Sequence, residues 1–117
     1  MSRKSLNSPE ETRPFEGGTG QVDLVSTSAG LVGRAVFQPD WRWSKHVGPI
    51  AQTDSCQSPH LGYCESGQMR VVMDDGQEME VGAGDIFEIP PGHDAWIVGD
   101  QPCVVIDWQG FGGYAKR

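Results

Sequence analysis

The stretch GPIAQTDSCQSPHLGYCESG, residues 48–67, decides the fold of this chain and holds its densest chemistry. Between its two terminal glycines lie Asp54, Cys56 and His60, at offsets of 0, 2 and 6 residues. Carboxylate, thiolate and imidazole groups are all ligands of transition metals. The stretch therefore indicates a metal-binding segment.

Downstream of this stretch, the chain consists of short runs of β-branched and apolar residues separated by turn formers, a pattern typical of strands. The strongest signal is QMRVVMDDGQEMEVGAGDIFEIPPG, residues 68–92. Its Asp75-Gly76 pair predicts a tight hairpin, because glycine readily adopts the positive φ that such a turn needs. HLGYCES before it and AWIV and CVVIDW after it predict further strands.

Upstream, QVDLV and LVGRAVFQ predict two strands by their period of two. WRWSKHV, residues 41–47, predicts a third strand with its tryptophans on one face, and a short strand is expected between Gly48 and Cys56. The whole chain then has about nine or ten short strands and no convincing helical periodicity, which predicts an all-β sandwich or barrel.

The two ends of the chain differ from this pattern. Residues 1–18 are polar and interrupted by prolines and a glycine pair, so we expect a disordered or loosely ordered tail, or else a strand exchanged with a partner subunit. Residues 19–117 are expected to form one domain. The glycine-rich end, GFGGYAKR, is expected to be a second loose tail.

Composition excludes several classes of partner. A net charge of −7, from sixteen acidic and nine basic residues, repels a phosphate backbone and argues against nucleic acid. No apolar run approaches the ~18 residues of a membrane helix, and the first residues lack the apolar segment of a secretory signal, so we expect a cytoplasmic protein without membrane contact. The three cysteines, Cys56, Cys64 and Cys103, are expected to be free thiols, the latter two as small buried hydrophobes.

A second stretch, GDIFEIPPGHDAWIVG at residues 84–99, gives the first its meaning. Together they resemble the two motifs of the cupin family, which are G-x5-H-x-H-x3,4-E-x6-G and G-x5-P-x-G-x2-H-x3-N. The structural positions of these motifs are matched by Gly48, Gly67, Gly84, Pro90 and Gly92. The likeness spans about residues 30–108 and implies a single-domain cupin, a small β-barrel or double-stranded β-helix (jelly roll). The PPGHDAW segment is similar in particular to small bacterial cupins of unassigned activity.

The metal ligands are where the chain departs from that family. Cupins hold Fe, Mn, Ni or Zn with three His and one Glu, and the corresponding positions here are Asp54, Cys56, His60 and Ala95. Three of these can still coordinate, and a thiolate favours Zn or Fe over Mg or Ca. His93 is the candidate for the fourth ligand, because in an extended strand it shares a face with Ala95, although their origins differ by about 7 Å.

The resemblance leaves three alternatives for the barrel pocket. A divalent metal with an open position would support a metal-dependent lyase, isomerase, cyclase or oxygenase acting on a small molecule. A metal-free pocket would use His60 or His93 as the catalytic acid or base near Cys56. A barrel without metal would only bind a small molecule, as a sensor does, or pack against a partner subunit.

Other residues carry weaker expectations. Trp96 is the tryptophan expected to line the ligand pocket, and the remaining tryptophans are expected in the core or a dimer interface. Asp54 has a structural alternative as an ordinary turn residue. His46 is expected at the surface or an interface. Cupins commonly pair through edge strands, so we expect a homodimer, which light scattering giving the mass of one chain would contradict.

Overall fold

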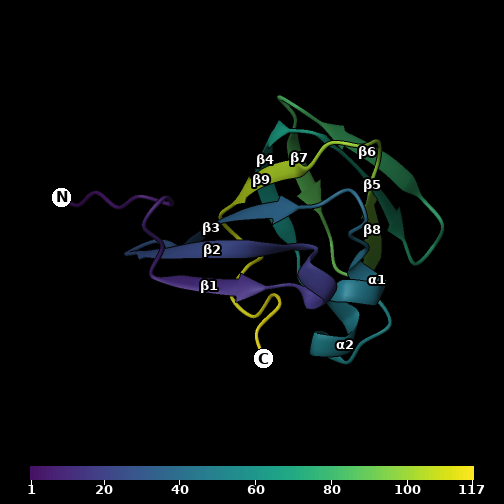
Figure 1. Ribbon diagram of the computed structural model, residues 1–117, viewed down its shortest axis with the longest axis horizontal. Helices are drawn as coiled ribbons and strands as arrows, with labels where there is room; N and C mark the ends of the chain where they lie inside the picture. Colours follow the sequence, from purple (N-terminus) through teal and green to yellow (C-terminus); the bar gives the residue numbers. More distant parts are fainter.

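The computed structural model describes residues 1–117, which form nine β-strands and three short helical segments (Figure 1). In chain order these are β1 (Glu11–Pro14), η1 (Glu16–Gly18), β2 (Gly20–Thr27), β3 (Gly30–Phe37), α1 (Trp43–His46), α2 (Gly48–Ala51), β4 (His60–Ser66), β5 (Gln68–Met73), β6 (Glu78–Gly82), β7 (Ile86–Ile89), β8 (His93–Ile97) and β9 (Cys103–Asp107). The helices are all short, and none has the length and apolar character needed to cross a membrane.

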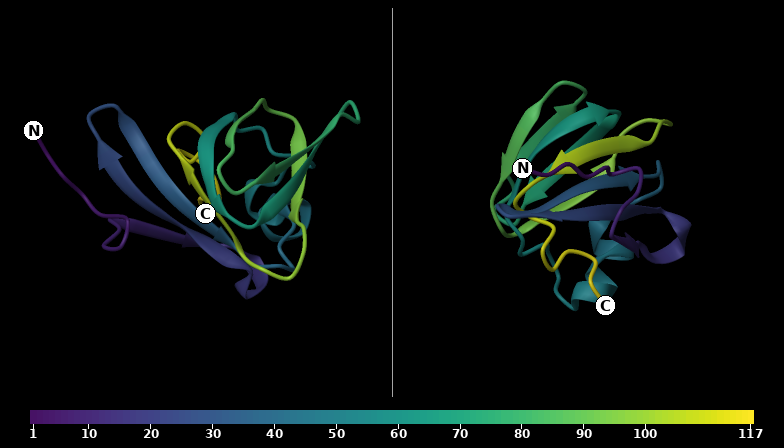
Figure 2. Two further views of the ribbon diagram at one scale, coloured as in Figure 1. Left: turned by 90° about the horizontal axis from the view of Figure 1, so that it is seen from above. Right: turned by 90° about the vertical axis from the view of Figure 1, so that its left-hand side faces the viewer.

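The strands form two antiparallel sheets. The larger has the order β1-β2-β3-β9-β4-β7, and the smaller has the order β6-β5-β8. The sheets curl toward each other into a small barrel, and the β2–β3 hairpin extends beyond it on one side (Figure 2). This arrangement confirms the expected all-β fold, a double-stranded β-helix.

The core lies between the sheets and follows the period-two alternation of each strand. On β9 the inward, buried residues are Cys103, Val105 and Asp107, and on β8 they include His93 and Ala95. Most of the buried side chains are apolar and form one cluster. Asp107 and His93 are therefore polar exceptions on otherwise apolar inward faces.

The segment after β3 is helical, so the strands predicted over residues 41–47 and from Gly48 to Cys56 are wrong. Arg42 keeps an extended backbone there, with φ −142° and ψ 132°, and Cys56 forms an isolated β-bridge with His93. His46 Nδ1 accepts a hydrogen bond of 2.9 Å from the Arg42 N–H, which holds the turn closed. Pro49 stands in the first turn of α2, where a missing N–H has no cost. Helices of four residues are too short to produce a readable period.

Part of the N-terminal segment expected to be loosely ordered is built into the larger sheet. β1 pairs with β2 in antiparallel register. Phe15, which follows β1, is buried and stacks on Phe37, with ring centroids 5.4 Å apart. Residues 11–15 therefore belong to the packed domain.

The C-terminal segment is also packed, so the expectation of a loose tail there is wrong. Phe111 and Tyr114 are buried against the barrel. Arg13, itself buried, donates from Nη1 to the carbonyl oxygens of Phe111 (2.8 Å), Gly112 (3.1 Å) and Tyr114 (3.0 Å). The Arg13 guanidinium thus supplies hydrogen-bond donors to the carbonyl oxygens of a glycine-rich segment that belongs to no strand or helix.

Candidate metal centre

Three ligand-capable side chains meet inside the barrel. Cys56, His60 and His93 form a Cys/His cluster whose ligand atoms all lie within 4.8 Å of one another. The three residues are 2%, 6% and 3% exposed, respectively. His60 opens β4 and His93 opens β8, and a backbone bridge joins Cys56 to His93, with its N–H donating to the His93 carbonyl at 2.7 Å. This bridge brings the two cupin-like sequence motifs together.

The spacing of the cluster suits a tetrahedral ion. Cys56 Sγ lies 3.6 Å from His60 Nε2. A thiolate and an imidazole bound to tetrahedral Zn, at bond lengths near 2.3 Å and 2.05 Å, stand about 3.6 Å apart. The donor set and its spacing therefore fit a bound transition metal.

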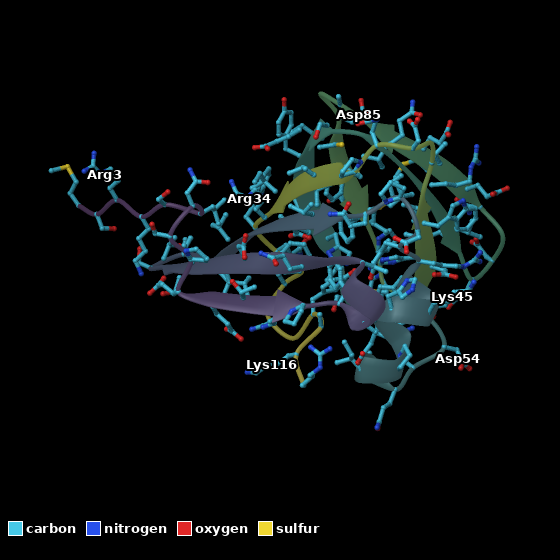
Figure 3. The ribbon with its side chains drawn as sticks, viewed as in Figure 1. Arg3, Arg34, Lys45, Asp54, Asp85 and Lys116 are labelled. Carbon is cyan, nitrogen blue, oxygen red and sulfur yellow. The ribbon has the colours of Figure 1, made fainter.

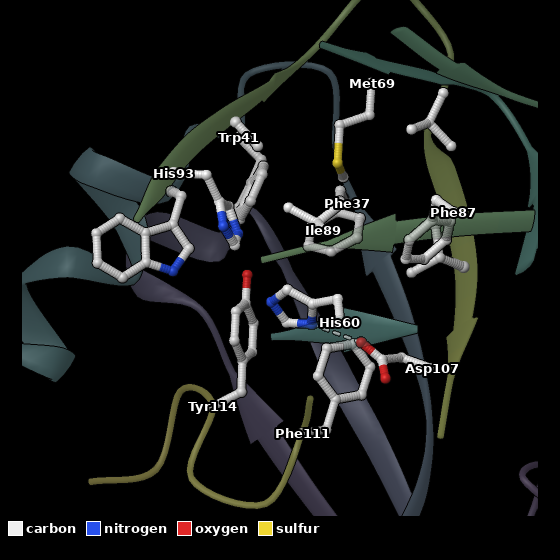
Figure 4. Close-up of a pocket in the computed structure, with 14 residues that line it drawn as sticks. Phe37, Trp41, His60, Met69, Phe87, Ile89, His93, Asp107, Phe111 and Tyr114 are labelled. Atoms are coloured by element: carbon white, nitrogen blue, oxygen red, sulfur yellow. Dashed lines mark hydrogen bonds and ion pairs between the residues drawn. The ribbon is translucent and has the colours of Figure 1, made fainter. Parts of the chain in front are cut away.

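Both histidines are held in the tautomer that a metal ligand requires (Figure 4). His60 Nδ1 lies 2.5 Å from the Asp107 carboxylate, and His93 Nδ1 lies 2.9 Å from the Pro90 carbonyl. Because both of these oxygens accept, each Nδ1 carries a proton, so Nε2 is the nitrogen of each ring that can coordinate a metal once any proton on it is released. Metal-binding histidines typically have such a partner on the second ring nitrogen.

The Asp107 carboxylate is fully engaged in this arrangement. Its Oδ2 accepts from His60, while its Oδ1 accepts 2.8 Å hydrogen bonds from the backbone N–H groups of Gln109 and Gly110. A Cβ on Gly110 would lie 2.1 Å from His60 Nδ1, so only glycine allows this approach. The carboxylate is thus fixed in the position that orients the imidazole.

The Cys56 thiol and the His60 imidazole shift each other's pKa in opposite directions. Burial raises the pKa of the Cys56 thiol, but hydrogen bonds and charges of His60 and His93 outweigh it and lower the pKa from 9.0 to about 6. Burial lowers the pKa of His60, but Asp107 and Cys56 outweigh it and raise the pKa from 6.5 to about 9. Without metal, the pair is a thiolate and an imidazolium at neutral pH. The thiolate is the form that binds metal, and binding would release the His60 proton.

Two residues proposed from the sequence lie away from the cluster. Asp54 is exposed on the loop after α2, and its carboxylate is not among the three grouped ligands (Figure 3). Residues 53–55 form bends and not the short strand expected between Gly48 and Cys56, so strand alternation does not bring Asp54 to the same side as Cys56. Trp96 follows the inward-facing Ala95 and points to the opposite face of β8. The Arg42 guanidinium lies over its ring, with Cζ 4.6 Å from the ring centroid.

The Cys/His cluster borders a largely apolar cavity (Figure 4). The cavity is lined by Phe37, Trp41, Trp43, His60, Met69, Val81, Phe87, Ile89, His93, Ala95, Val105, Asp107, Phe111 and Tyr114. Trp96 is not among these residues, whereas two other tryptophans are. The cavity is narrow, with a volume of about 30 Å³. It therefore holds only a few waters while its walls stay in place.

Sequence reasoning missed two polar residues of this site. Asp107 left a signal, because it continues the inward series Cys103 and Val105 on β9, where an acid is out of place. Tyr114 left none, since it lies in the glycine-rich end without periodicity. Its ring packs against His60 at a centroid distance of 5.4 Å, and its hydroxyl points toward the space between His60 and His93 (Figure 4).

Comparisons with known proteins agree with this architecture. Residues 52–109 match the family model of the cupin domain. No curated protein sequence matches the chain at a significant level.

Three solved structures illustrate the shared fold. A polyketide cyclase from Streptomyces resistomycificus has a TM-score of 0.64 at 18% identity, over 94% of this chain and 79% of that one. An uncharacterised double-stranded β-helix protein from Klebsiella pneumoniae has a TM-score of 0.62 at 21% identity, over 97% of this chain and 93% of that one. A sugar phosphate isomerase of the cupin superfamily from Silicibacter pomeroyi has a TM-score of 0.60 at 16% identity, over 92% of this chain and 76% of that one. Residues 52–109 thus resemble the cupin domain, and the chain has the double-stranded β-helix fold.

Proposed function

We propose that this protein is a metal-dependent enzyme in which Cys56, His60 and His93 hold a divalent transition metal and a small molecule reacts in the adjoining cavity. One observation carries the proposal. Three ligand atoms lie within 4.8 Å of one another inside the barrel, and both imidazoles are held through Nδ1, which leaves Nε2 as the coordinating nitrogen.

The donor set favours Zn or Fe as the ion. One sulfur and two imidazole nitrogens are soft or borderline donors, which bind these metals better than Mg or Ca. Three protein ligands are typical of catalytic sites, because a fourth position stays open for water or substrate. Asp54 is not needed in this scheme.

When bound, such a metal acts as a Lewis acid on a substrate oxygen or lowers the pKa of a coordinated water. The chain itself supplies orientation and a dry environment. Asp107 and the Pro90 carbonyl fix the two imidazoles. The apolar walls exclude water, which strengthens every electrostatic contact inside. The Tyr114 hydroxyl faces the same space and can donate a hydrogen bond to a bound molecule (Figure 4).

For the reaction, we propose the range that a metal with an open position serves in this fold, namely lyase, isomerase, cyclase or oxygenase chemistry. The polyketide cyclase and the sugar phosphate isomerase that share the fold support this range. The apolar lining favours a substrate with little polar surface, because burying unpaired polar groups is costly.

A second candidate function is binding without turnover, as in a sensor. It is favoured by the state of Asp107, which is the one carboxylate lining the cavity. All its contacts are taken by His60 and two backbone N–H groups, so it is not free to act as a general base. In this alternative a ligand would raise the melting temperature with no product formed.

Elemental analysis of purified protein tests the proposal. Wild type should carry about one transition metal per chain, as a three-ligand site does. Cys56→Ala and His60→Ala should each lose the metal while the folded state is retained. Asp54→Ala is the matched control and should keep the metal, because its carboxylate lies outside the cluster. A metal-free wild type after supplementation with Zn and Fe, or equal loss in the control, would overturn the proposal.

A further inference from the structure

Two buried hydrogen-bond donors in the cavity wall have no partner. The indole nitrogens of Trp41 and Trp43 are buried without any hydrogen-bond acceptor in the protein, and both residues line the cavity. Each residue is 2% exposed. An unpaired buried donor costs about 1–3 kcal/mol, and native proteins contain few of them. Two in one cavity wall indicate a ligand that accepts their hydrogen bonds.

The backbone around the two indoles is fixed, so they do not turn away to find water. The Asp94 carboxylate accepts from Arg42 Nε at 3.1 Å and from the Ser44 N–H at 3.0 Å. Arg42 is extended, which directs its two neighbours to the opposite side from its own guanidinium. Trp41 and Trp43 therefore both face the barrel interior.

The remaining polar groups of the cavity show which chemistry is lacking. The Asp107 carboxylate already accepts three hydrogen bonds. Once a metal takes Nε2 of His60 and of His93, the polar groups left to contact a ligand are the two indoles and the Tyr114 hydroxyl, all of which can donate. No Lys or Arg lines the cavity, so a phosphate group would find no cationic side chain. The other walls are mostly aromatic and aliphatic, which favours a flat, apolar molecule.

We infer that the cavity binds a flat, largely apolar compound carrying a carbonyl or enolate oxygen, which accepts hydrogen bonds from the indole N–H groups of Trp41 and Trp43. This inference names the substrate class of the proposed function and rests on the proposal that a small molecule binds beside the cluster. It separates the site from that of an enzyme for phosphorylated sugars.

Entry of such a compound requires a wall to move, because the free space holds only a few waters. The C-terminal segment is that wall, since Phe111 and Tyr114 line the cavity and the segment has no strand or helix. Its main anchors are the three hydrogen bonds from Arg13 to carbonyl oxygens. We therefore expect this segment to open for entry and to close again with the Tyr114 hydroxyl facing the bound compound.

Two probes of nearly equal shape test the inference. Acetophenone carries a carbonyl oxygen, and α-methylstyrene replaces that oxygen with a methylene group. In protein labelled with ¹⁵N at its four tryptophans, acetophenone should shift two indole N–H resonances downfield by hydrogen bonding, and α-methylstyrene should shift them less, through its ring current alone. Trp41→Phe and Trp43→Phe assign these two signals. If acetophenone shifts neither signal, or both probes shift them equally, the inference is overturned.

Dissociation constants give a second readout. The ratio of the α-methylstyrene constant to the acetophenone constant should fall about tenfold from wild type to the Trp41→Phe, Trp43→Phe double variant. The difference in hydrophobicity between the probes cancels in this comparison. Trp96→Phe is the matched control and should leave the ratio unchanged, because Trp96 lies outside the cavity. An unchanged ratio in the folded double variant would also overturn the inference.

Both measurements are made on metal-loaded and on chelator-treated protein, with the metal content determined in each sample. If wild type holds no metal but the indole signals still respond to acetophenone, the inference stands and the metal proposal fails. If metal is bound and the signals do not respond, the reverse holds. The two failures are therefore distinguishable.

Discussion

The three cysteines occupy two regions of the barrel that are equally buried and chemically opposite. Cys56 lies in the Cys/His cluster at 2% exposure, and Cys64 and Cys103 lie side by side on β4 and β9 at 0%, with their sulfurs 3.9 Å apart. The pKa of Cys56 is lowered to about 6. Burial raises the pKa of both Cys64 and Cys103.

Burial alone does not account for this difference, because it disfavours the thiolate in both regions. What differs is the partner of the sulfur. Cys56 faces His60 at 3.6 Å, whereas Cys64 faces another thiol and the Ser66 carbonyl at 3.4 Å. An imidazolium stabilises a thiolate by its positive charge, whereas a neutral thiol is only a weak donor to it and a carbonyl oxygen has no proton to donate. The neighbouring imidazoles therefore convert a core cysteine into a candidate ligand.

The largest expected effect is on thiol alkylation. In chelator-treated native protein at pH 7, iodoacetamide should modify Cys56 at least about 100-fold faster than Cys64 or Cys103, because Cys56 is mostly thiolate and the other two, with raised pKa values, are almost wholly thiol. As the pH falls through about 6, Cys56 should become protonated and lose this reactivity. The two other thiols should gain reactivity only above pH 9, since their pKa values are raised. Peptide mass spectrometry gives the rate at each site.

Bound metal supplies the control for this experiment. Addition of Zn before iodoacetamide should protect Cys56, because a coordinated thiolate is a poorer nucleophile, and should leave the other two rates unchanged. Equal rates at all three sites in the metal-free protein would contradict the comparison.

A smaller effect, on metal affinity, is expected when the carboxylate that orients the His60 imidazole is replaced and all three thiols are left in place. Asp107→Asn removes the carboxylate that holds His60 Nδ1 at 2.5 Å, so the ring loses its fixed orientation. Replacement of such a partner typically weakens metal binding about 10- to 100-fold. Competition with a chelator of known affinity measures the change. Asp54→Asn is the matched control, and an equal loss there would show that net charge, and not orientation, determines affinity.

Sequence patterns were sufficient for the part of the fold in which contacts are local. The strands from β4 to β9 were predicted, and the predicted hairpin is confirmed, with Gly76 at φ 92° between β5 and β6. Alternation and turn chemistry act over a few residues, so they can be read without the fold. The candidate ligands Cys56, His60 and His93 came from the spacing of the two motifs.

The rest depended on contacts between distant parts of the chain. Asp107 approaches His60 across 47 residues, and Arg13 holds the C-terminal carbonyls from 98 to 101 residues away. No local pattern carries that information. His93 lies two residues, or about 7 Å, along the strand from the expected ligand position at Ala95. It nevertheless joins the cluster, because the backbone bridge to Cys56 sets its position. Asp54 did not, because its loop is not extended.

The smallest expected effect comes from the structural thiols. Cys64→Ala should lower the free energy of unfolding by about 1 kcal/mol, the cost of removing one buried atom from a close-packed core. It should leave metal content unchanged, because Cys64 makes no contact with the cluster ligands. Cys56→Ala should instead lose the metal, even where its change in the free energy of unfolding is similar. Urea denaturation and elemental analysis of the same samples measure both quantities. If Cys64→Ala released metal, the two cysteine regions would be coupled through β4, and the contrast between ligand and packing thiols would not hold.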